Sequence, residues 1–569
     1  MTVVLGLCAY THDSAAALLI DGHLVGFVEE ERLSGVKHTK EYPRLAVDWL
    51  LRKARISSED VDLVAYNFSW PLYLKAVPRA AALLASPTTA ARAWPRARGF
   101  ATVAARTLRR ERALGRAFPR ARVRPVVHHR AHQTYAFAAS GYEDAAVLVI
   151  DSLGETQTTT IAHGLRRGSG RPEVHTLQAI DDPASLGYVY GAVTAHLGWR
   201  RGDEEGTVMA LAALGDPARF RSLFARALRV TPDGFTVDPG LFPPRTLQPG
   251  AGRVTRRFTA ATCPPRTADD PVEQVHRDLA AALQERTGAV MLHLARRARD
   301  LTGSSRLCLG GGVAANCVGV GAMVEEGIYD EVFVPPAPGD AGTALGAAAA
   351  VHLATAPQPL SGVEGACYLG PDYPTAVPDR DRWPGLTVRR LSGDRAGFLA
   401  DQLVDGRIVG LFQGRAEAGP RALGNRSILA SPLSAGVVDR LNSAVKYREP
   451  FRPFAPVVPA DRAAEYFCLG QEAPFMSVAS RVTAQARERI PAVVHANGTA
   501  RVQTVTPAQN PLLHATLEAF ALRTGVPVLI NTSLNVKGKP MCGTPEMALD
   551  CLAESGLDAL LLEDWWVTP

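Results

Sequence analysis

The sequence predicts an α/β protein that folds as two domains. Two groups of apolar strand patterns, near residues 3–29 and 145–164, each contain a polar turn between strands. Further along, glycine-rich turns join strand patterns to helical patterns, as is typical of α/β proteins. Periodicity fails at 356–362, where turn residues collect, so we expect domains at 1–357 and 358–569. With 569 residues and 47% apolar composition, the chain is long enough for two or more cores.

The N-terminal region is predicted to contain a duplicated hairpin. Strand patterns at 3–7, 15–20 and 23–29 surround the pair Asp21-Gly22, which is a strong signal for a tight turn. Strand, polar turn and strand return at 145–164. A repeated unit of this kind, with turns that face phosphate groups, is how actin/sugar-kinase-like (ASKHA) ATPases are built, so we expect an ASKHA-like domain in the N-terminal part of this chain. Two hairpins alone would be weak evidence for that class.

A glycine-rich turn strengthens the prediction. The strand pattern that starts at Arg306 runs into Gly310, Gly311 and Gly312, and a helical pattern begins near Asn316. Three glycines let the backbone approach a nucleotide and direct helix N–H groups toward it. A tight strand-to-helix turn without a ligand would have the same sequence, and this alternative stays open.

Two histidines form a candidate metal half-site. His128 and His132 stand four apart, which on a helix places both imidazoles on one face. Asp151 ends an apolar run, and Asp340 lies in a glycine-bounded turn, so these two carboxylates could complete the site. Such a mixed nitrogen and oxygen set suits Fe(II), Mn(II) or Zn(II). The spacing alone equally allows surface histidines with Asp151 as a helix cap.

The C-terminal unit has a different character. Between 410 and 454, arginines and lysines are embedded among Gly, Pro and Phe rather than along a helix face. Rigid loops that present arginine forks fit a concave site for phosphate groups. A surface salt-bridge network is the alternative interpretation.

Charge and composition limit the classes of partner. The net charge is +6, and residues 71–124 carry thirteen Lys/Arg with Glu111 as their one acid. Because the arginines alternate with apolar residues at helical spacing, we interpret this stretch as a solvated helix pair, which makes nucleic acid an unlikely partner. No apolar run approaches the roughly 20 residues that span a bilayer, so we expect a cytoplasmic protein with no membrane partner. The eight cysteines contain no C-x-x-C motif and are expected to be reduced.

Seven motifs, spread over almost the whole chain, match one known family. They are HDSAA at 12–16, EEER at 29–32, HHRAH at 128–132, GGGVAAN at 310–316, GDAG at 339–342, GPRALGNRS at 419–427 and GTARVQT at 498–504. The chain resembles the O-carbamoyltransferases that modify antibiotics and nodulation factors. The resemblance implies an N-terminal half similar to the metal-binding protein that forms threonylcarbamoyladenosine in transfer RNA. It also implies a C-terminal α/β domain of the YrdC-like type, similar to the enzyme that supplies the adenylate.

The resemblance assigns roles to single residues. The metal ligands correspond to His128, His132, Asp151 and Asp340, and the general base to His12. Carbamoyl phosphate or the phosphates of ATP would contact Arg421, Arg452, Arg501 and Asn531, with Lys37 as a further contact. The adenosine loop corresponds to Gly312 and Asn316. Implied cofactors are a divalent metal, with Fe(II) ahead of Mn(II) and Zn(II), and ATP with Mg²⁺. One departure concerns Thr207 and Ala210, which stand where we expect Lys and Gly.

The implied reaction is an ATP-dependent carbamoyl transfer in antibiotic biosynthesis. Carbamoyl phosphate and ATP would give carbamoyl-adenylate, and a hydroxyl of a small molecule would accept the carbamoyl group. Because Asp13 is the one acid close to His12, we expect a neutral polyketide or glycoside rather than a polycationic aminoglycoside. A homo-oligomer is compatible with the sequence, which leaves the oligomeric state open.

Other classes of protein explain less. A sugar kinase accounts for the hairpins but not for His128 and His132. A metallopeptidase would need Glu where His129 stands. A transfer-RNA-modifying or RNA-binding protein remains the alternative, because both related halves act in transfer-RNA modification and residues 71–124 are basic.

Overall fold

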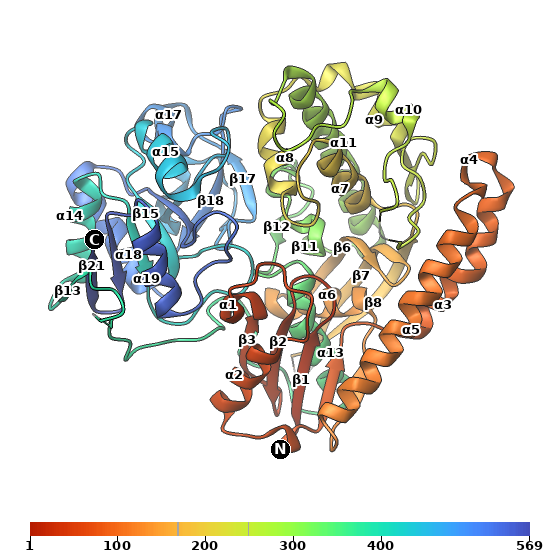
Figure 1. Cartoon of the computed structure of the whole chain (residues 1–569), viewed down its shortest axis with the longest axis horizontal. Coiled ribbons are helices and arrows are strands. Elements are labelled where there is room, and N and C mark those ends of the chain that lie inside the picture. Colours follow the sequence, from red (N-terminus) through yellow and green to blue (C-terminus); the bar gives the residue numbers. More distant parts are fainter. Residues whose placement is uncertain (168–169, 249, 380) are drawn as a thin grey trace. The chain divides into compact units, whose positions relative to one another are not determined.

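The computed structural model describes residues 1–167, 170–248, 250–379 and 381–569, and it has a mixed α/β fold (Figure 1). The chain forms two compact units. Unit 1 comprises 1–26, 40–43 and 50–365, and unit 2 comprises 27–39, 44–49 and 366–569. The α/β class predicted from the sequence is therefore confirmed, whereas the division at residue 357 stays a prediction.

The first sheet of unit 1 has the strand order β3-β2-β1-β4-β5. Its strands are β1 (Val3–Cys8), β2 (Ala15–Ile20), β3 (His23–Glu29), β4 (Leu63–Tyr66) and β5 (Arg122–Pro125). β1 pairs antiparallel with β2 and parallel with β4, which in turn pairs parallel with β5. Asp21 and Gly22 both have positive φ, at 48° and 83°, as the predicted tight turn between β2 and β3 requires.

The second sheet repeats this order as β12-β11-β6-β7-β8. Its strands are β6 (Asp144–Gly154), β7 (Gln157–Arg167), β8 (Arg171–Asp181), β11 (Arg306–Gly310) and β12 (Glu331–Phe333). β7 pairs antiparallel with β6 and β8, and β11 pairs parallel with β6 and β12. The predicted duplication is thus present as two sheets with the same strand order. Unit 1 also has a small β9 (Leu228–Thr231) and β10 (Gly234–Val237) hairpin.

Two helices rich in small residues hold these sheets together. α6 (His128–Ser140) and α13 (Thr343–Thr355) pack so closely that a Cβ on Gly346 would lie 1.9 Å from the carbonyl oxygen of Ala131. A Cβ on Gly6 of β1 would lie 2.0 Å from the carbonyl oxygen of Ala344. Backbone contact at this distance is open only to glycine, and it fixes the starts of both helices relative to one another.

Other helices of unit 1 surround this centre. They include the long helix α11 (Gln274–Thr302), with α7 (Leu186–His196), α8 (Glu205–Ala212), α9 (Arg221–Ala227), α10 (Arg256–Ala261) and α12 (Cys317–Glu325). The basic stretch forms α3 (Trp70–Arg79), α4 (Pro87–Ala90) and α5 (Ala93–Ala117), and α3 lies along α5 as the predicted helix pair (Figure 1). No helix in the described ranges is long and apolar enough to cross a membrane.

Unit 2 is built on one nine-stranded sheet with the order β13-β21-β20-β14-β15-β19-β16-β18-β17. Its strands are β13 (Thr387–Arg390), β14 (Val409–Phe412), β15 (Arg426–Ala430), β16 (Ala455–Pro459), β17 (Val478–Arg481), β18 (Thr499–Val505), β19 (Leu529–Ser533), β20 (Ala559–Leu562) and β21 (Trp565–Thr568). α14 (Arg395–Val404) and α18 (Pro511–Thr524) share one apolar core with the sheet. α15 (Gly436–Leu441), α16 (Ala463–Tyr466), α17 (Ala484–Arg489) and α19 (Pro545–Glu554) share another. The early helix α1 (Glu30–Ser34) and residues 44–49 of α2 (Arg44–Ala54) also belong to this unit.

Candidate functional site

All four predicted metal ligands lie together in unit 1. His128 and His132 are on the first two turns of α6, Asp151 is near the end of β6, and Asp340 begins the short turn that leads into α13. His128 Nε2 lies 3.2 Å from His132 Nε2, 3.6 Å from Asp151 Oδ2 and 3.5 Å from Asp340 Oδ1. One ligand atom from each residue lies within 4.8 Å of all the others, and the two imidazoles and Asp151 are buried.

These distances fit four ligands around one cation. Ligands about 2.1 Å from a metal stand about 3.0 to 4.2 Å from one another, according to the angle between them. The electrostatics also favour a positive charge here. Burial would lower the pKa of His128, but the carboxylates of Asp340 and Asp151 raise it well above its usual value. Burial, together with the charge of His128, lowers the pKa of His132 to about 4, so that this imidazole is a neutral ligand.

The surroundings of His128 orient its ring. The ring stacks on Phe68, with centroids 4.7 Å apart and planes at 4°, and Nδ1 lies 3.4 Å from the carbonyl oxygen of Asn67. The buried carboxylate of Glu155 accepts the backbone N–H groups of His128, at 3.2 Å, and Ser69, at 2.8 Å. Glu155 therefore satisfies the first free N–H of α6 and holds the helix start in place. Nε2 is left to face the carboxylates.

His12 lies beside the same cluster. The hydroxyl of its neighbour Thr11 donates to Asp340 Oδ2 at 3.2 Å. His12 Nδ1 is 3.3 Å from Asp13 Oδ2, and the His12 side chain is 40% exposed. An imidazole paired with a carboxylate and open to solvent can take a proton from an incoming hydroxyl.

The glycine turn also contacts the cluster. Gly311 has a φ of 87°, and a Cβ there would lie 2.3 Å from the carbonyl oxygen of Ile150. The N–H of Gly312 donates to Asp151 Oδ1 at 3.2 Å. Asn316 caps α12 through the N–H of Gly319, and its amide forms two hydrogen bonds with Gln284, each 3.0 Å long. Gln284 lies inside a helical pattern, where no local signal in the sequence singles it out.

The predicted phosphate contacts all fall in unit 2. Arg421 is in the loop between β14 and β15, Arg452 precedes β16, Arg501 is on β18 and Asn531 is on β19. Asn531 is fully buried, and its Nδ2 donates to the carbonyl oxygen of Ala422, next to Arg421, at 3.2 Å. Within the described ranges, Asn531 Oδ1 is a buried acceptor with no hydrogen bond.

Lys37 is connected to the same loop through its own segment. It is half-buried and follows α1, whose Arg32 Nη2 donates to the carbonyl oxygen of Gly419 at 2.6 Å. Glu29 accepts the N–H of Gly419, also at 2.6 Å. These contacts tie residues near 30 to residues near 420 within unit 2.

Two family models match this chain, one in each half. Residues 3–349 match the model of the family "Carbamoyltransferase N-terminus", and residues 400–568 match "Carbamoyltransferase C-terminus". The chain belongs to the carbamoyltransferase family. The resemblance inferred from the sequence motifs is confirmed.

The relatives of this carbamoyltransferase include a nodulation protein and an O-carbamoyltransferase. Nodulation protein NolNO of Sinorhizobium fredii is 34% identical, over 98% of this chain and 79% of that protein. The 3'-hydroxymethylcephem-O-carbamoyltransferase of Amycolatopsis lactamdurans is 38% identical, over 50% of this chain and 53% of that enzyme. Among solved structures, HypF of T. kodakarensis aligns with a TM-score of 0.32 and 14% identity, over 64% of this chain and 49% of that one. A score this low supports no statement about function.

Two further cations of the carbamoyltransferase lie next to the predicted ones. Lys446 is buried, and its Nζ donates to Asn535 Oδ1 at 2.7 Å and to the carbonyl oxygen of Ser533. Burial, followed by the charge of Arg448, lowers the pKa of Lys446 to about 7. Burial, followed by the charges of Arg452 and Arg501, lowers the pKa of Arg448 to about 9. Both cations stand in the basic stretch 446–452, but the sequence does not separate them from surface charges.

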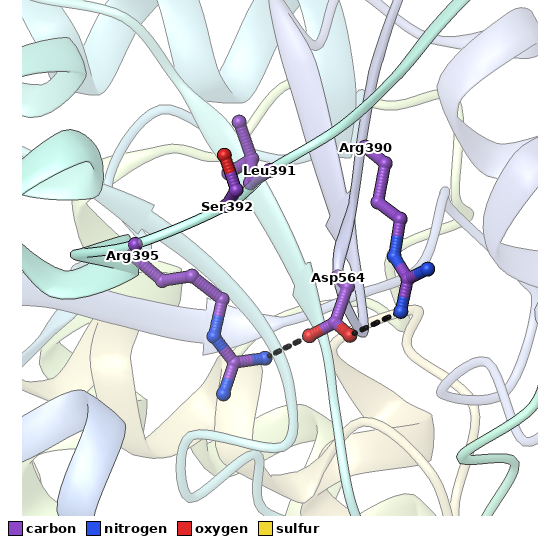
Figure 2. Close-up of a pocket in the computed structure, with 6 residues that line it drawn as sticks. Arg390, Leu391, Ser392, Arg395 and Asp564 are labelled. Carbon is purple, nitrogen blue, oxygen red and sulfur yellow. Dashed lines mark hydrogen bonds and ion pairs between the residues drawn. The ribbon is translucent and has the colours of Figure 1, made fainter.

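A surface pocket of unit 2 does not include any predicted site residue. It is lined by Arg390, Leu391, Ser392, Gly393, Arg395 and Asp564 (Figure 2). Asp564 lies between the two arginines, 2.8 Å from Arg395 Nη1 and 3.6 Å from Arg390 Nη2. Because the carboxylate already pairs with both guanidinium groups, we assign this pocket no phosphate.

Proposed function

We propose that the protein is an ATP-dependent O-carbamoyltransferase with one half-reaction in each unit. Unit 2, as a YrdC-like domain, makes carbamoyl-adenylate, and unit 1, as an ASKHA-like domain, moves the carbamoyl group to a hydroxyl of a natural product. The acceptor class is a polyketide or glycoside in antibiotic biosynthesis. The observation that carries the proposal is the cluster of His128, His132, Asp151 and Asp340 in a chain of the carbamoyltransferase family.

In the first half-reaction, cations of unit 2 hold the phosphates. Water takes the phosphoryl group of carbamoyl phosphate and leaves carbamate, whose oxygen attacks the α-phosphorus of ATP-Mg²⁺, and pyrophosphate leaves. Arg421, Arg452 and Arg501, with Lys37 at the edge, stabilise the charge on the phosphates. The buried Oδ1 of Asn531 is suited to accept an N–H of the carbamoyl group.

In the second half-reaction, His12 takes the proton of the acceptor hydroxyl. The oxygen attacks the carbamoyl carbon, the bond to the adenylate phosphate breaks, and a carbamate ester and AMP form. Gly312 and Asn316 hold the adenosine part. A divalent cation on the four ligands, Fe(II) rather than Mn(II) or Zn(II), would polarise the carbamoyl carbonyl. Thr11 links the His12 segment to Asp340, so the base is held beside the reacting carbonyl.

The His12→Ala variant tests this division of labour. We expect it to release pyrophosphate from ATP and carbamoyl phosphate as the wild type does, while transfer to a hydroxyl falls by about 10² to 10⁴. Transfer is measured by mass spectrometry as the gain of one carbamoyl group on members of a natural-product panel. A variant that no longer releases pyrophosphate would contradict the assignment of His12 to the second step.

The Arg421→Ala and Arg501→Ala variants should show the opposite pattern. Loss of a charge-assisted contact to phosphate weakens binding by about 2 to 5 kcal/mol, so pyrophosphate release should be lost. Both variants should still transfer the carbamoyl group from adenylate that is supplied ready-made. Normal pyrophosphate release in both would rule out the phosphate site in unit 2.

A further inference from the structure

Unit 1 contains a group of arginines that the proposed reaction does not use. The guanidinium groups of Arg245 and Arg253 lie over the ring of Tyr188, with Cζ 4.7 and 5.4 Å from its centroid. The stem of Arg201 lies against Gly191, one turn further along α7, where a Cβ would be 2.8 Å from Arg201 Cγ. Because residues three apart share a face of a helix, the three arginines surround one patch of α7.

Only some of these charges have partners. Asp182 pairs with Arg96, at 2.5 Å, and with Arg245, at 2.8 Å, and all three side chains are buried. By contrast, Arg201 and Arg253 form no ion pair or hydrogen bond with the part of the chain that the structure describes. The nearest acid to Arg201, Glu205, accepts the N–H of Gly202 at 2.7 Å. Burial, followed by the charge of Arg201, lowers the pKa of Arg253 to about 10, as expected for crowded cations.

The arginines lie next to the residues assigned to transfer. Gly202, the neighbour of Arg201, faces His12, since a Cβ there would be 3.6 Å from His12 Cε1. Arg245 Nη2 donates to the carbonyl oxygen of Ser152, the residue after Asp151, at 2.8 Å. The segment that carries Arg201 and the guanidinium of Arg245 therefore lie beside residues assigned to the transfer step.

The nucleotide loop lies on the other side of α7. Asn316 contacts Gln284, and Gln284 Oε1 accepts the hydroxyl of Tyr190 at 2.9 Å. Tyr188 and Tyr190 are two residues apart, so their side chains point to opposite faces of the helix. The arginine patch is thus on the face that does not serve the adenosine.

We propose that Arg201 and Arg253, backed by Arg245, form a subsite for an acidic group of the acceptor, a carboxylate or a phosphate. This inference rests on the proposed function and makes the acceptor acidic, where the sequence alone led us to expect a neutral one. The contrast with Figure 2 supports it, because there Asp564 already pairs with both arginines. Guanidinium groups that lack such a partner are the usual receptors for carboxylate and phosphate.

Arginine labelling tests the subsite directly. Phenylglyoxal modifies accessible guanidinium groups, and peptide mass spectrometry of the full-length protein reports each position. We expect millimolar sulfate, at constant ionic strength, to slow the labelling of Arg201 and Arg253 several-fold, and AMP to protect them less. Arg116, exposed on the last turn of α5, is the matched control. Equal labelling of Arg201 and Arg253 with and without sulfate would overturn the subsite, and stronger protection by AMP would assign the arginines to the nucleotide.

Turnover supplies the second test. Hydroxyl compounds are offered in pairs that differ by one carboxylate or phosphate, and carbamoylation is measured by mass gain. We expect preference for the acidic member and, in the Arg201→Gln/Arg253→Gln variant, a KM for it raised about tenfold or more, with a smaller change in kcat. Arg116→Gln is the control. If the wild type preferred the neutral members and the double variant kept that preference, the subsite would be refuted. If the wild type released no pyrophosphate, the proposed function would be refuted, and the labelling result would still stand.

Discussion

Replacing Arg426 with methionine should loosen the loop that carries Arg421. The Arg426 side chain is fully buried, with its guanidinium 3.7 Å above the ring of Phe412. It donates to four backbone carbonyl oxygens, those of Gln413, Asn425, Pro371 and Gly414, at 2.6 to 3.0 Å. Gln413, Gly414 and Asn425 stand at the two ends of the loop, and Pro371 belongs to a separate segment that packs against it.

The loss of stability depends on which of the four carbonyl oxygens keep another hydrogen-bond donor. The oxygens of Asn425 and Pro371 still accept the N–H groups of Gln413 and Ala416, so in the described structure only the oxygens of Gln413 and Gly414 lose their donor. A buried polar group without a partner costs about 1 to 3 kcal/mol, so two such oxygens cost about 2 to 6 kcal/mol together. We therefore expect a loss of about 2 to 6 kcal/mol in the local stability of unit 2.

Hydrogen exchange measured by mass spectrometry can follow this region alone. In the Arg426→Met variant, peptides that span 409–430 should exchange faster by a factor on the order of 10² to 10³. Arg407→Met, at an exposed position of the same unit, should leave exchange unchanged. If the peptides of Arg426→Met exchanged at the wild-type rate, the buried guanidinium would not be what holds the loop.

Three shorter predictions concern the two sites. Lys446, with a pKa of about 7, is mostly neutral at pH 8, and a bound phosphate would raise that pKa again. The protein should therefore take up about one proton when it binds ATP at pH 8, which calorimetry in buffers of different ionisation enthalpy can measure. The Lys446→Met variant should lose this proton uptake. His132→Ala should lower the bound metal, measured by atomic emission, from about one equivalent to near zero. Glu155→Gln, which puts an amide against the N–H groups of Ser69 and His128, should weaken metal affinity about 10- to 100-fold without removing a ligand.

Local spacing predicted the parts of the fold that depend on short-range rules. The turn at Asp21-Gly22 and the placement of His128 and His132 on one helix follow from the turn and helix periodicities. Such short-range rules could not predict contacts between residues that are far apart in the sequence. Glu29 accepts the N–H of Gly419, 390 positions later, and the segment 27–39 belongs to unit 2. Glu155, in a turn where its own φ is 47°, accepts the N–H of His128 at the start of α6.

The candidate site shows the same limit. Asp151 and Asp340 were candidates because one ends an apolar run and the other lies in a glycine-bounded turn, and the family resemblance then joined them to the two histidines, since no spacing links positions some 190 residues apart. Lys446 and Arg448 stand in the basic stretch already noted, but their burial depends on the fold of the whole unit. Gln284 and Arg253 carry no local signal at all. Burial and pairing are tertiary properties, so a residue type alone does not reveal them.

Charge pairing is what separates structural from functional residues in this protein. Asp182 compensates Arg96 and Arg245, and backbone carbonyls surround Arg426, so these buried cations have partners within the fold. At two places in unit 1 the compensation is incomplete. Asp151 and Asp340 both lie close to His128 Nε2 and favour an added cation, whereas Arg201 and Arg253 form no ion pair within the described part of the chain and favour an added anion. Thr11 contacts Asp340, and Gly202, next to Arg201, faces His12, so a cation-bound carbamoyl donor and an acidic acceptor would both be directed toward the same base.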